Sequence, residues 1–318
     1  MTKSLYELMQ MAVDIVASSP HTSNKISACL VGEDLSGKPF AVARTNFWPE
    51  AIVRDIGQDI KIGNSSGTVH AETACILAVA GEVGTRTKGA QVFITDPPCP
   101  NCVKNIAEAG IAEIYIDHKG FDKDWAKRRG EDFDSMALQI CKEAGISVAK
   151  IHRKEQRVEP ILEVAADYQP PLEKPFHLQV LDDSDWDFAA LVQGRADVYG
   201  AEPFAAAIAY GVDRKPFFLS AEAHLVIGYT EDNASQPEGK YTYMIEPMNR
   251  LIMTAARKGM VLDAAHIYSS RIPSARELVN MVGAGLQEIT VAHKDQSRDE
   301  WGLQALQQLE AAGILTVK

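Results

Sequence analysis

The feature that most constrains the fold is a strand–helix–strand run at residues 90–117, in which each connection is only a few residues long. "AQVFITD" has the apolar, β-branched character of a buried strand, "CPNCVKNIAEAG" has helical spacing and ends at Gly110, and "IAEIYID" is a second strand. Strands joined through a helix in this way lie parallel in one sheet. The pattern continues with a helix at "DFDSMALQICKEAG", closed by Gly145, and a strand at "ISVAKI". The sequence therefore predicts an α/β domain with a largely parallel sheet.

The N-terminal residues add a helix and a hairpin to this domain. "KISACLVGED" and "PFAVARTNFW" are β-rich runs joined by "LSGK", which predicts one antiparallel pair. The first twenty residues resemble an export signal in their apolar content, but Glu7 and Asp14 interrupt them, and Ser4 with Glu7 forms a capping-box pattern. We therefore expect an amphipathic first helix and a cytoplasmic protein. No apolar run approaches the length that a membrane span needs.

Length and charge limit the organisation and the partners. With 318 residues, two domains are expected. Residues 153–175 carry four prolines among charges, which predicts a linker between a first domain at 1–152 and a second at 176–318. The net charge of −11 argues against a large polyanion such as tRNA, so a nucleic-acid partner is not expected. The basic run at 127–129 is more typical of a solvated face than of a phosphate site.

An internal repeat indicates that the two domains are related. Residues 90–119 align without gaps on residues 265–294, so that Gly110 falls on Gly285. The helix "HAETACILAVAG" then matches "EPMNRLIMTAAR". We favour a duplicated domain over a coincidental match between unrelated α/β domains.

Two helix starts carry the residues that point to chemistry. Cys99 and Cys102 form P-C-P-N-C at the start of one predicted helix, and His70 opens another. Sulfurs one helical turn apart can share one ion, and the partial positive charge of a helix N-terminus favours thiolates. Three mixed nitrogen and sulfur ligands fit a catalytic zinc, because a fourth position stays open for water. Glu72, two residues beyond His70, is then placed to act on the substrate.

Each element of this pattern has a simpler interpretation when taken alone. An H-x-E triplet arises by chance, and a lone C-x-x-C can be a redox pair. The other cysteines, Cys29, Cys75 and Cys141, are interpreted as small buried hydrophobic residues. The joint pattern, H-x-E on one helix followed by a strand and P-C-x-x-C on the next, is much more specific, and it is the known signature of zinc nucleobase deaminases.

Residues 25–150 resemble the cytidine/deoxycytidylate deaminase superfamily, through "VHAE" and "TDPPCPNC". The resemblance implies a three-layer α/β/α sandwich with a five-stranded mixed sheet, here duplicated. It implies a Zn²⁺ cofactor held by His70, Cys99 and Cys102, with Glu72 as the catalytic proton shuttle. The following "VKNIAEAGIAEIYID" looks more like deoxycytidylate deaminases than like classical cytidine deaminases.

The same resemblance suggests substrate contacts. "RTNFWP" is similar to the N-x-x-P segment of the family, in which the Asn contacts the sugar, although it lacks the glycines that usually flank that segment. The expected substrate-binding residues are Asn46, Phe47, Trp48 and Ala71. Asn46 could instead satisfy a turn, and the two aromatic residues could belong to the core. Whether Arg54, Arg128 or Arg129 reaches a 5′-phosphate stays open at this point.

The resulting hypothesis is hydrolytic deamination of a cytosine-type nucleoside or nucleotide, with water attacking C4. The alternatives are deamination of adenosine in tRNA or of a free base such as guanine, and a binding or regulatory protein that retains zinc. In the aligned second domain, the three ligands and the shuttle are replaced by other residues, namely Glu246, Ser274, Glu277 and Met248. We therefore expect one zinc per chain, a degenerate second domain and, by resemblance, a homodimer.

Overall fold

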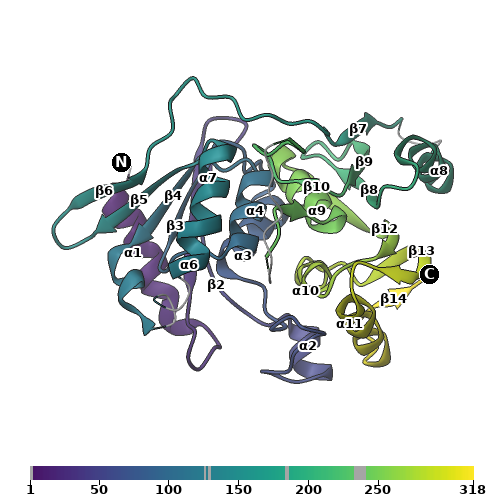
Figure 1. Ribbon diagram of the computed structural model, residues 1–318, viewed down its shortest axis with the longest axis horizontal. Coiled ribbons are helices and arrows are strands. Elements are labelled where there is room, and N and C mark those ends of the chain that lie inside the picture. The colour runs from purple at the N-terminus through teal and green to yellow at the C-terminus, as the bar shows by residue number, and fades with distance from the viewer. Residues whose placement is uncertain (1–2, 125–126, 128–129, 183–185, 233–240) are drawn as a thin grey trace. The chain divides into compact units, whose positions relative to one another are not determined.

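The computed structural model describes residues 3–124, 127, 130–182, 186–232 and 241–318 and divides into two compact units (Figure 1). The first unit comprises Met1–Phe47, His70–Glu173 and Leu225–Met244. The second unit comprises Trp48–Val69, Lys174–His224 and Ile245–Lys318. Among the described helices, none is long and apolar enough to cross a membrane.

The described part of the first unit is built on a six-stranded mixed sheet with the order β2-β1-β3-β4-β5-β6. Its strands are β1 (Ser27–Glu33), β2 (Pro39–Thr45), β3 (Gln91–Ile94), β4 (Glu113–Asp117), β5 (Ser147–His152) and β6 (Arg157–Leu162). β1 pairs antiparallel with β2 and β3, β3 and β5 flank β4 in parallel, and β6 is antiparallel to β5. The predicted mixed α/β sheet, with its hairpin and parallel strands, is confirmed.

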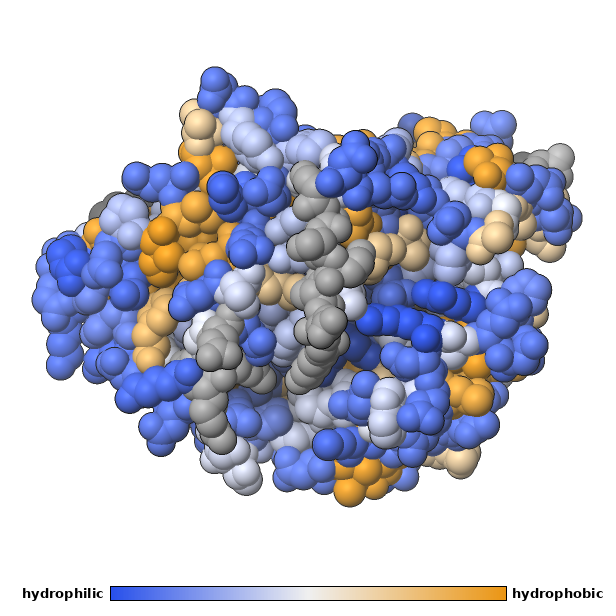
Figure 2. Space-filling model, viewed as in Figure 1, coloured by the Kyte–Doolittle hydropathy of each residue, from blue (hydrophilic) through white to orange (hydrophobic). Residues whose placement is uncertain are grey.

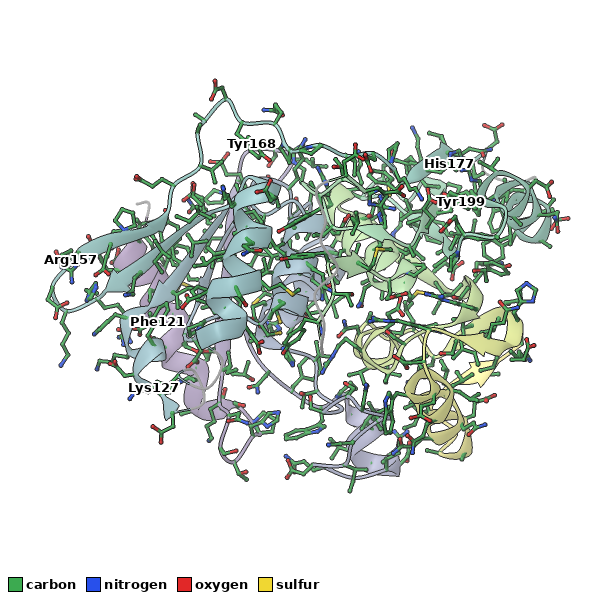
Figure 3. All side chains as sticks on the ribbon, viewed as in Figure 1. Phe121, Lys127, Arg157, Tyr168, His177 and Tyr199 are labelled. Atoms are coloured by element: carbon green, nitrogen blue, oxygen red, sulfur yellow. The ribbon has the colours of Figure 1, made fainter. Side chains whose placement is uncertain are left out.

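β6 is the strand that was not expected, because it lies in the proline-rich segment interpreted as a linker. Pro160 lacks an N–H, but β6 is the outermost strand, and the pairing register shifts between Val148 and Ala149 where Pro160 is accommodated. After β6 the chain stays attached to the first unit, since the hydroxyl of Tyr168 donates to the carbonyl of Glu143 at 2.8 Å (Figure 3). The structure thus makes part of residues 153–175 an edge of the sheet.

Helices cover the sheet of the first unit on both faces (Figure 1). α1 (Leu5–Ile15) begins at the capping box of Ser4 and Glu7 and packs Leu8, Met9 and Ala12 against Cys29 and Phe93. On the other face lie α3 (Ala71–Ala78), α4 (Pro100–Glu108) and α7 (Leu138–Ala144). Shorter helical segments complete the unit: η1 (Val16–Ser18), η2 (Val79–Val83), η3 (His118–Asp122), α6 (Gly130–Asp132) and η4 (Phe133–Ala137).

The described part of the second unit contains its own six-stranded mixed sheet, in the order β14-β13-β12-β8-β9-β7. The strands are β7 (His177–Val180), β8 (Phe204–Tyr210), β9 (Pro216–Glu222), β12 (Val261–Ile272), β13 (Glu288–Ser297) and β14 (Thr316–Val317). The helices are α2 (Glu50–Asp55), α8 (Phe188–Tyr199), α9 (Pro247–Lys258), α10 (Ala275–Gly283) and α11 (Glu300–Ala311). A separate short pair, β10 (His224–Leu225) with β11 (Met244–Ile245), lies where the chain passes between the units.

The two sheets share one topology. The run β9-β8-β12-β13-β14 repeats β2-β1-β3-β4-β5, with two antiparallel pairings followed by two parallel ones in each case. The helices α3, α4 and α7 interleave with the first run as α9, α10 and α11 do with the second. The aligned residues 90–119 and 265–294 belong to the β3-α4-β4 and β12-α10-β13 parts of these runs.

Two segments lie in a different unit from the one expected from their position in the sequence. Residues 48–69 lie in the second unit, where Arg276 donates to the carbonyl of Thr68 and Gln308 donates to that of Lys61. Residues 225–244 lie in the first unit, where Lys104 Nζ donates to the carbonyls of Thr242 and Met244. The units therefore differ from the expected domains at 1–152 and 176–318, because these long connections find their partners outside their own sheet.

Side chains elsewhere follow the usual partition between core and surface. The face seen in Figure 2 is predominantly hydrophilic, with separate apolar spots. The second unit packs Phe204, Ile208 and Phe218 of its sheet against α8, where Tyr199 also donates or accepts a hydrogen bond with Ser220 (Figure 3). Each unit therefore has a hydrophobic core of its own.

Candidate active site

The three expected ligands lie at the starts of two helices of the first unit. His70 is the N-cap residue of α3, Cys99 is the N-cap residue of α4, and Cys102 is the third residue of α4. Pro100 follows Cys99 at the first helical position, where its missing N–H costs nothing. Neither His nor Cys is favoured as an N-cap. Their positions are therefore explained better by a bound group than by helix capping.

The fold brings these side chains together. His70 Nδ1 lies 3.1 Å from Cys102 Sγ and 3.7 Å from Cys99 Sγ, and all three atoms lie within 4.8 Å of one another. Around a tetrahedral zinc with ordinary bond lengths, a nitrogen and a sulfur ligand are separated by about 3.5 Å. The donor set and its spacing fit that ion. This group could hold a metal, and in the described part of the chain it contains three His, Cys, Asp or Glu ligands and no fourth.

Glu72 lies beside the group on the first turn of α3. Its side chain is 4% exposed. Burial raises the pKa of the Glu72 carboxyl, the nearby His70 opposes that shift, and negative charge on Cys99 adds to it. A carboxyl that holds a proton more readily than usual is suited to accept and return protons.

The other cysteines are buried within the first unit and remain thiols. Burial raises the pKa of Cys29 to about 11 and also raises the pKa values of Cys75 and Cys141. Cys75 donates to the carbonyl of Ala28 at 3.3 Å. These three residues therefore have the role of small core side chains, as the sequence indicates.

The expected substrate contacts do not all lie in the same unit. Ala71 is the first residue of α3 and is fully buried, and Phe47 is half-buried at the end of the first segment of the first unit. Trp48 lies in the second unit, where its ring is close to Gly67. Arg54 is also in the second unit and forms an ion pair with Asp55 at 2.6 Å. Arg128 and Arg129 are outside the described residues.

Asn46 is engaged in the local structure of the first unit. Its Oδ1 accepts from Ser19 Oγ at 2.7 Å and from the N–H of Ile26 at 3.1 Å, and its Nδ2 donates to the carbonyl of Asn24 at 2.8 Å. The side chain is buried, with 5% exposure. These hydrogen bonds correspond to the alternative role of Asn46, in which its side chain satisfies polar groups of a turn. They leave one N–H of the amide for a ligand.

The sequence analysis missed a polar support at the end of β3. Thr95 Oγ1 donates to Asp96 Oδ2 at 2.6 Å, and Lys123 pairs with Asp96 Oδ1 at 2.5 Å. Burial raises the pKa of Asp96, and the ion pair with Lys123 opposes that shift. Gly120 packs so closely that a Cβ there would lie 2.3 Å from the carbonyl oxygen of Thr95. These contacts hold the turn that leads from β3 to Cys99. The sequence feature that could have predicted them is the polar pair Thr95-Asp96 directly after the strand.

Comparison with known proteins places this site in a family. Residues 2–118 match the family model described as the cytidine and deoxycytidylate deaminase zinc-binding region. ComE operon protein 2 of Bacillus subtilis (strain 168) is 30% identical over 94 residues, which are 29% of this chain and 42% of that protein. The deoxycytidylate deaminase of Enterobacteria phage T4 is 33% identical over 91 residues, again 29% of this chain and 42% of that protein. The chain thus spans less than half the length of these two relatives.

Solved structures give a weaker likeness. The dCMP deaminase of cyanophage S-TIM5 in its apo form has a TM-score of 0.31 and 21% identity, covering 48% of this chain and 100% of that one. The same enzyme in complex with dCMP and dUMP has a TM-score of 0.34 and 21% identity, covering 48% and 99%. The family match at residues 2–118 includes His70, Cys99 and Cys102 at the two helix starts. Residues 2–118 are therefore a cytidine and deoxycytidylate deaminase zinc-binding domain.

Proposed function

We propose that the first unit is a zinc-dependent hydrolase that deaminates the cytosine ring of a nucleoside or nucleotide. The observation that carries the proposal is the convergence of His70, Cys99 and Cys102 beside the buried carboxyl of Glu72. Three protein ligands leave one position of a tetrahedral zinc for water, as catalytic sites require. Structural zinc sites, by contrast, are usually closed by a fourth protein ligand.

The proposed chemistry divides between the ion and the chain. Zinc held by this group would lower the pKa of a water molecule and so supply the nucleophile at neutral pH. Glu72 accepts a proton from that water and gives it to N3 of the ring as the oxygen adds to C4. Glu72 then transfers the second proton of the water to the exocyclic amine, the C4–N4 bond breaks, and ammonia leaves a uracil ring behind. One carboxyl serves as base and acid in turn, which requires that it stay off the metal.

The surroundings of the ligands favour this chemistry. The N-termini of α3 and α4 carry partial positive charge, which stabilises the thiolate forms of Cys99 and Cys102. The burial of Glu72 keeps bulk water from competing for its protons. Removal of either effect would slow the reaction without changing the ligand set.

The nature of the substrate rests on the relatives. The phage T4 protein is named a deoxycytidylate deaminase, which supports a deoxycytidylate-like nucleotide for this chain. Contacts of Asn46 with the sugar, and of Phe47, Trp48 and Ala71 with the base, stay predictions, as does a homodimer.

Three other functions have less support. Deamination of adenosine in tRNA is disfavoured by the net charge of −11, and deamination of a free base such as guanine would need no contact to a sugar. A binding or regulatory protein with a retained zinc would not need a buried proton-holding carboxyl beside the ligands. Glu72 is thus the residue that favours catalysis.

For the second unit we propose a degenerate copy of the same domain that binds no zinc. Its support is the shared strand order and the equivalent helix starts: Glu246 and Ser274 are the N-cap residues of α9 and α10, and Glu277 is the third residue of α10. Met248 takes the position of Glu72. A hydroxyl and two carboxylates in these places form a poor site for an ion that prefers thiolate and imidazole.

The experiment that tests the function measures ammonia released by the full-length protein from cytidine, dCMP, guanine and adenosine, together with zinc content. We expect about one zinc per chain and release from the cytosine compounds only. Ammonia release from guanine alone would instead support a free-base deaminase, and release from adenosine alone would support a deaminase of adenosine in tRNA. A zinc-loaded protein that releases ammonia from none of the four would support the binding or regulatory function.

A further inference from the structure

One helical turn behind the candidate ligands, a buried hydrogen bond joins the two helices that carry them. Asn105 Nδ2 on α4 donates to Thr73 Oγ1 on α3 at 3.2 Å. The two residues are 4% and 2% exposed, so water does not compete for this bond. Because residues three apart share one face of a helix, Thr73 lies behind His70 and Asn105 lies behind Cys102. The bond therefore connects the helices directly behind His70 and Cys102, whose ligand atoms lie 3.1 Å apart.

The second unit contains the same bond at the equivalent positions. Asn280 Nδ2 on α10 donates to Asn249 Oδ1 on α9 at 2.8 Å. Asn249 is three residues after Glu246, and Asn280 is three residues after Glu277, as Thr73 and Asn105 follow His70 and Cys102. The bond thus occurs in a unit whose helix starts carry no His or Cys ligand. Its formation does not depend on a metal.

The two units differ in what joins the helix starts themselves. In the second unit, Glu277 spans them: its Oε1 accepts from the N–H groups of Met248 at 2.8 Å and Asn249 at 3.3 Å, and its Oε2 accepts from Ser274 N at 2.7 Å and Ser274 Oγ at 2.8 Å. One carboxyl therefore connects both helices without any ion.

In the first unit the position of Glu277 is held by Cys102, whose sulfur faces His70 Nδ1. The contact of Cys102 Sγ with His70 Nδ1 at 3.1 Å is a single link between the helix starts, whereas the carboxyl of Glu277 accepts four hydrogen bonds. A metal held by the three side chains would add to that single link. Before the metal is bound, contacts behind the ligands add to this single link in setting the spacing of the ligands. The bond between Thr73 and Asn105 is placed to do this.

We propose that Thr73 and Asn105 are positioning residues that hold His70 and Cys102 at ligand spacing in the metal-free protein. This inference rests on the proposed zinc site. A preformed site binds its ion more tightly, because the entropy lost in ordering the ligand side chains does not reduce the free energy of binding. Neither residue touches the metal or the substrate in this proposal. They act through the helices.

The test compares zinc dissociation constants of full-length variants, measured by competition with a chromogenic chelator. Thr73→Val keeps the shape of the side chain and removes the acceptor, whereas Thr73→Ser keeps the hydroxyl. We expect Thr73→Val to bind zinc about 10- to 100-fold more weakly, the range typical for residues that support metal ligands, and Thr73→Ser to bind within about 3-fold of the unsubstituted protein.

Asn249→Leu is the matched control, because it breaks the equivalent bond in the second unit. The melting temperatures of the metal-free variants show whether each bond matters for stability. We expect both Thr73→Val and Asn249→Leu to lower melting temperature, but only Thr73→Val to weaken zinc binding. A merely structural role would lower stability alone.

Two results would overturn the positioning role: zinc binding by Thr73→Val equal to that of the unsubstituted protein, or an equal weakening in Asn249→Leu. A failure of the proposed function looks different. The unsubstituted protein would then bind zinc tightly and release no ammonia, while the affinity comparison would still decide the role of Thr73. An unsubstituted protein that binds no zinc would overturn both proposals.

Discussion

His70 Nδ1 lies 3.1 Å from Cys102 Sγ, although 32 residues separate them in the chain. The contact arises because α3 and α4 both begin at the same region of the first unit, with His70 and Cys99 as their N-cap residues. Each ligand is placed by a helix start and not by a loop, and the two helices are themselves joined by a buried hydrogen bond. Side chains on helix starts are held more precisely than side chains on loops.

The first prediction concerns the proton shuttle. Glu72→Gln keeps the size of the side chain but cannot accept and return protons, so we expect turnover to fall by about 10²- to 10⁴-fold with zinc content unchanged. Ammonia release and metal analysis on the same sample measure both quantities. If the variant loses both its zinc and its activity, Glu72 supports the metal. Full activity of the variant would refute the mechanism.

The second prediction concerns the ligands. His70→Ala, Cys99→Ser and Cys102→Ser should each lose zinc, and their melting temperature should no longer rise when zinc is added. A ligand at 1,000 times its dissociation constant stabilises the folded state by about 4 kcal/mol. Cys75→Ser and Cys141→Ser are the controls, because both thiols are buried and belong to the core. Zinc loss in either control would mean that the wrong cysteines have been assigned.

The third prediction tests the placement of residues 48–69 in the second unit. Gly63 has a φ of +55°, and a Cβ there would lie 2.5 Å from the carbonyl oxygen of Trp301. Gly63→Ala therefore combines a left-handed backbone penalty of about 1–2 kcal/mol with a clash against backbone. Urea unfolding should show a larger loss of stability than in Gly37→Ala.

Gly37 is the matched position for this comparison. Its φ is +80°, and a Cβ there would have nothing within 4 Å, so only the backbone penalty applies. Equal losses in the two variants would show that residues around Gly63 do not pack on the helix that begins at Glu300.

The fourth prediction is a pH dependence of the second unit. Burial raises the pKa of Glu277 to about 7, and the nearby Glu246 raises it in the same direction, while hydrogen bonds from Ser274 and Met248 oppose the shift. Glu246 is itself paired with Arg271 at 2.8 Å and Arg298 at 3.3 Å. Since the folded pKa lies above the ordinary value of 4.5, the folded state binds the proton more tightly than the unfolded state does.

The stability contributed by this proton is fully present below pH 4.5 and is lost as the pH rises through about 7. Glu277→Gln has no proton to lose. The free energy of unfolding of the unsubstituted protein, minus that of Glu277→Gln, should therefore fall between pH 5 and pH 8 in chemical denaturation. A difference that stays flat or rises with pH would contradict the assignment.

The sequence alone determined the elements and the candidate ligands. Strands and helices follow from local periodicity, and the capping box at Ser4 and the helix ends at Gly110 and Gly145 follow from local backbone preferences. Local geometry predicts that a C-x-x-C at a helix start brings two sulfurs to one side, and His70 was added to them through the resemblance of H-x-E…P-C-x-x-C to the deaminase signature. The alignment of residues 90–119 with residues 265–294 predicts a matching strand, helix and strand in each half of the chain, and the shared order of five strands came from the structure.

Other features depend on which strands, surfaces and polar groups the rest of the fold leaves without a partner. Only the tertiary structure decided these features. Pro160 can enter a strand because β6 pairs on one side only, which no local pattern reveals. Residues 48–69 and 225–244 follow the apolar and polar partners that each unit offers, and not their order in the chain. The hydrogen bonds of Asn46, and the bond between Asn105 and Thr73, join residues whose separation in sequence carries no signal. Such contacts depend on how buried polar groups are satisfied in three dimensions, and that is settled only when the helices and the sheet pack together.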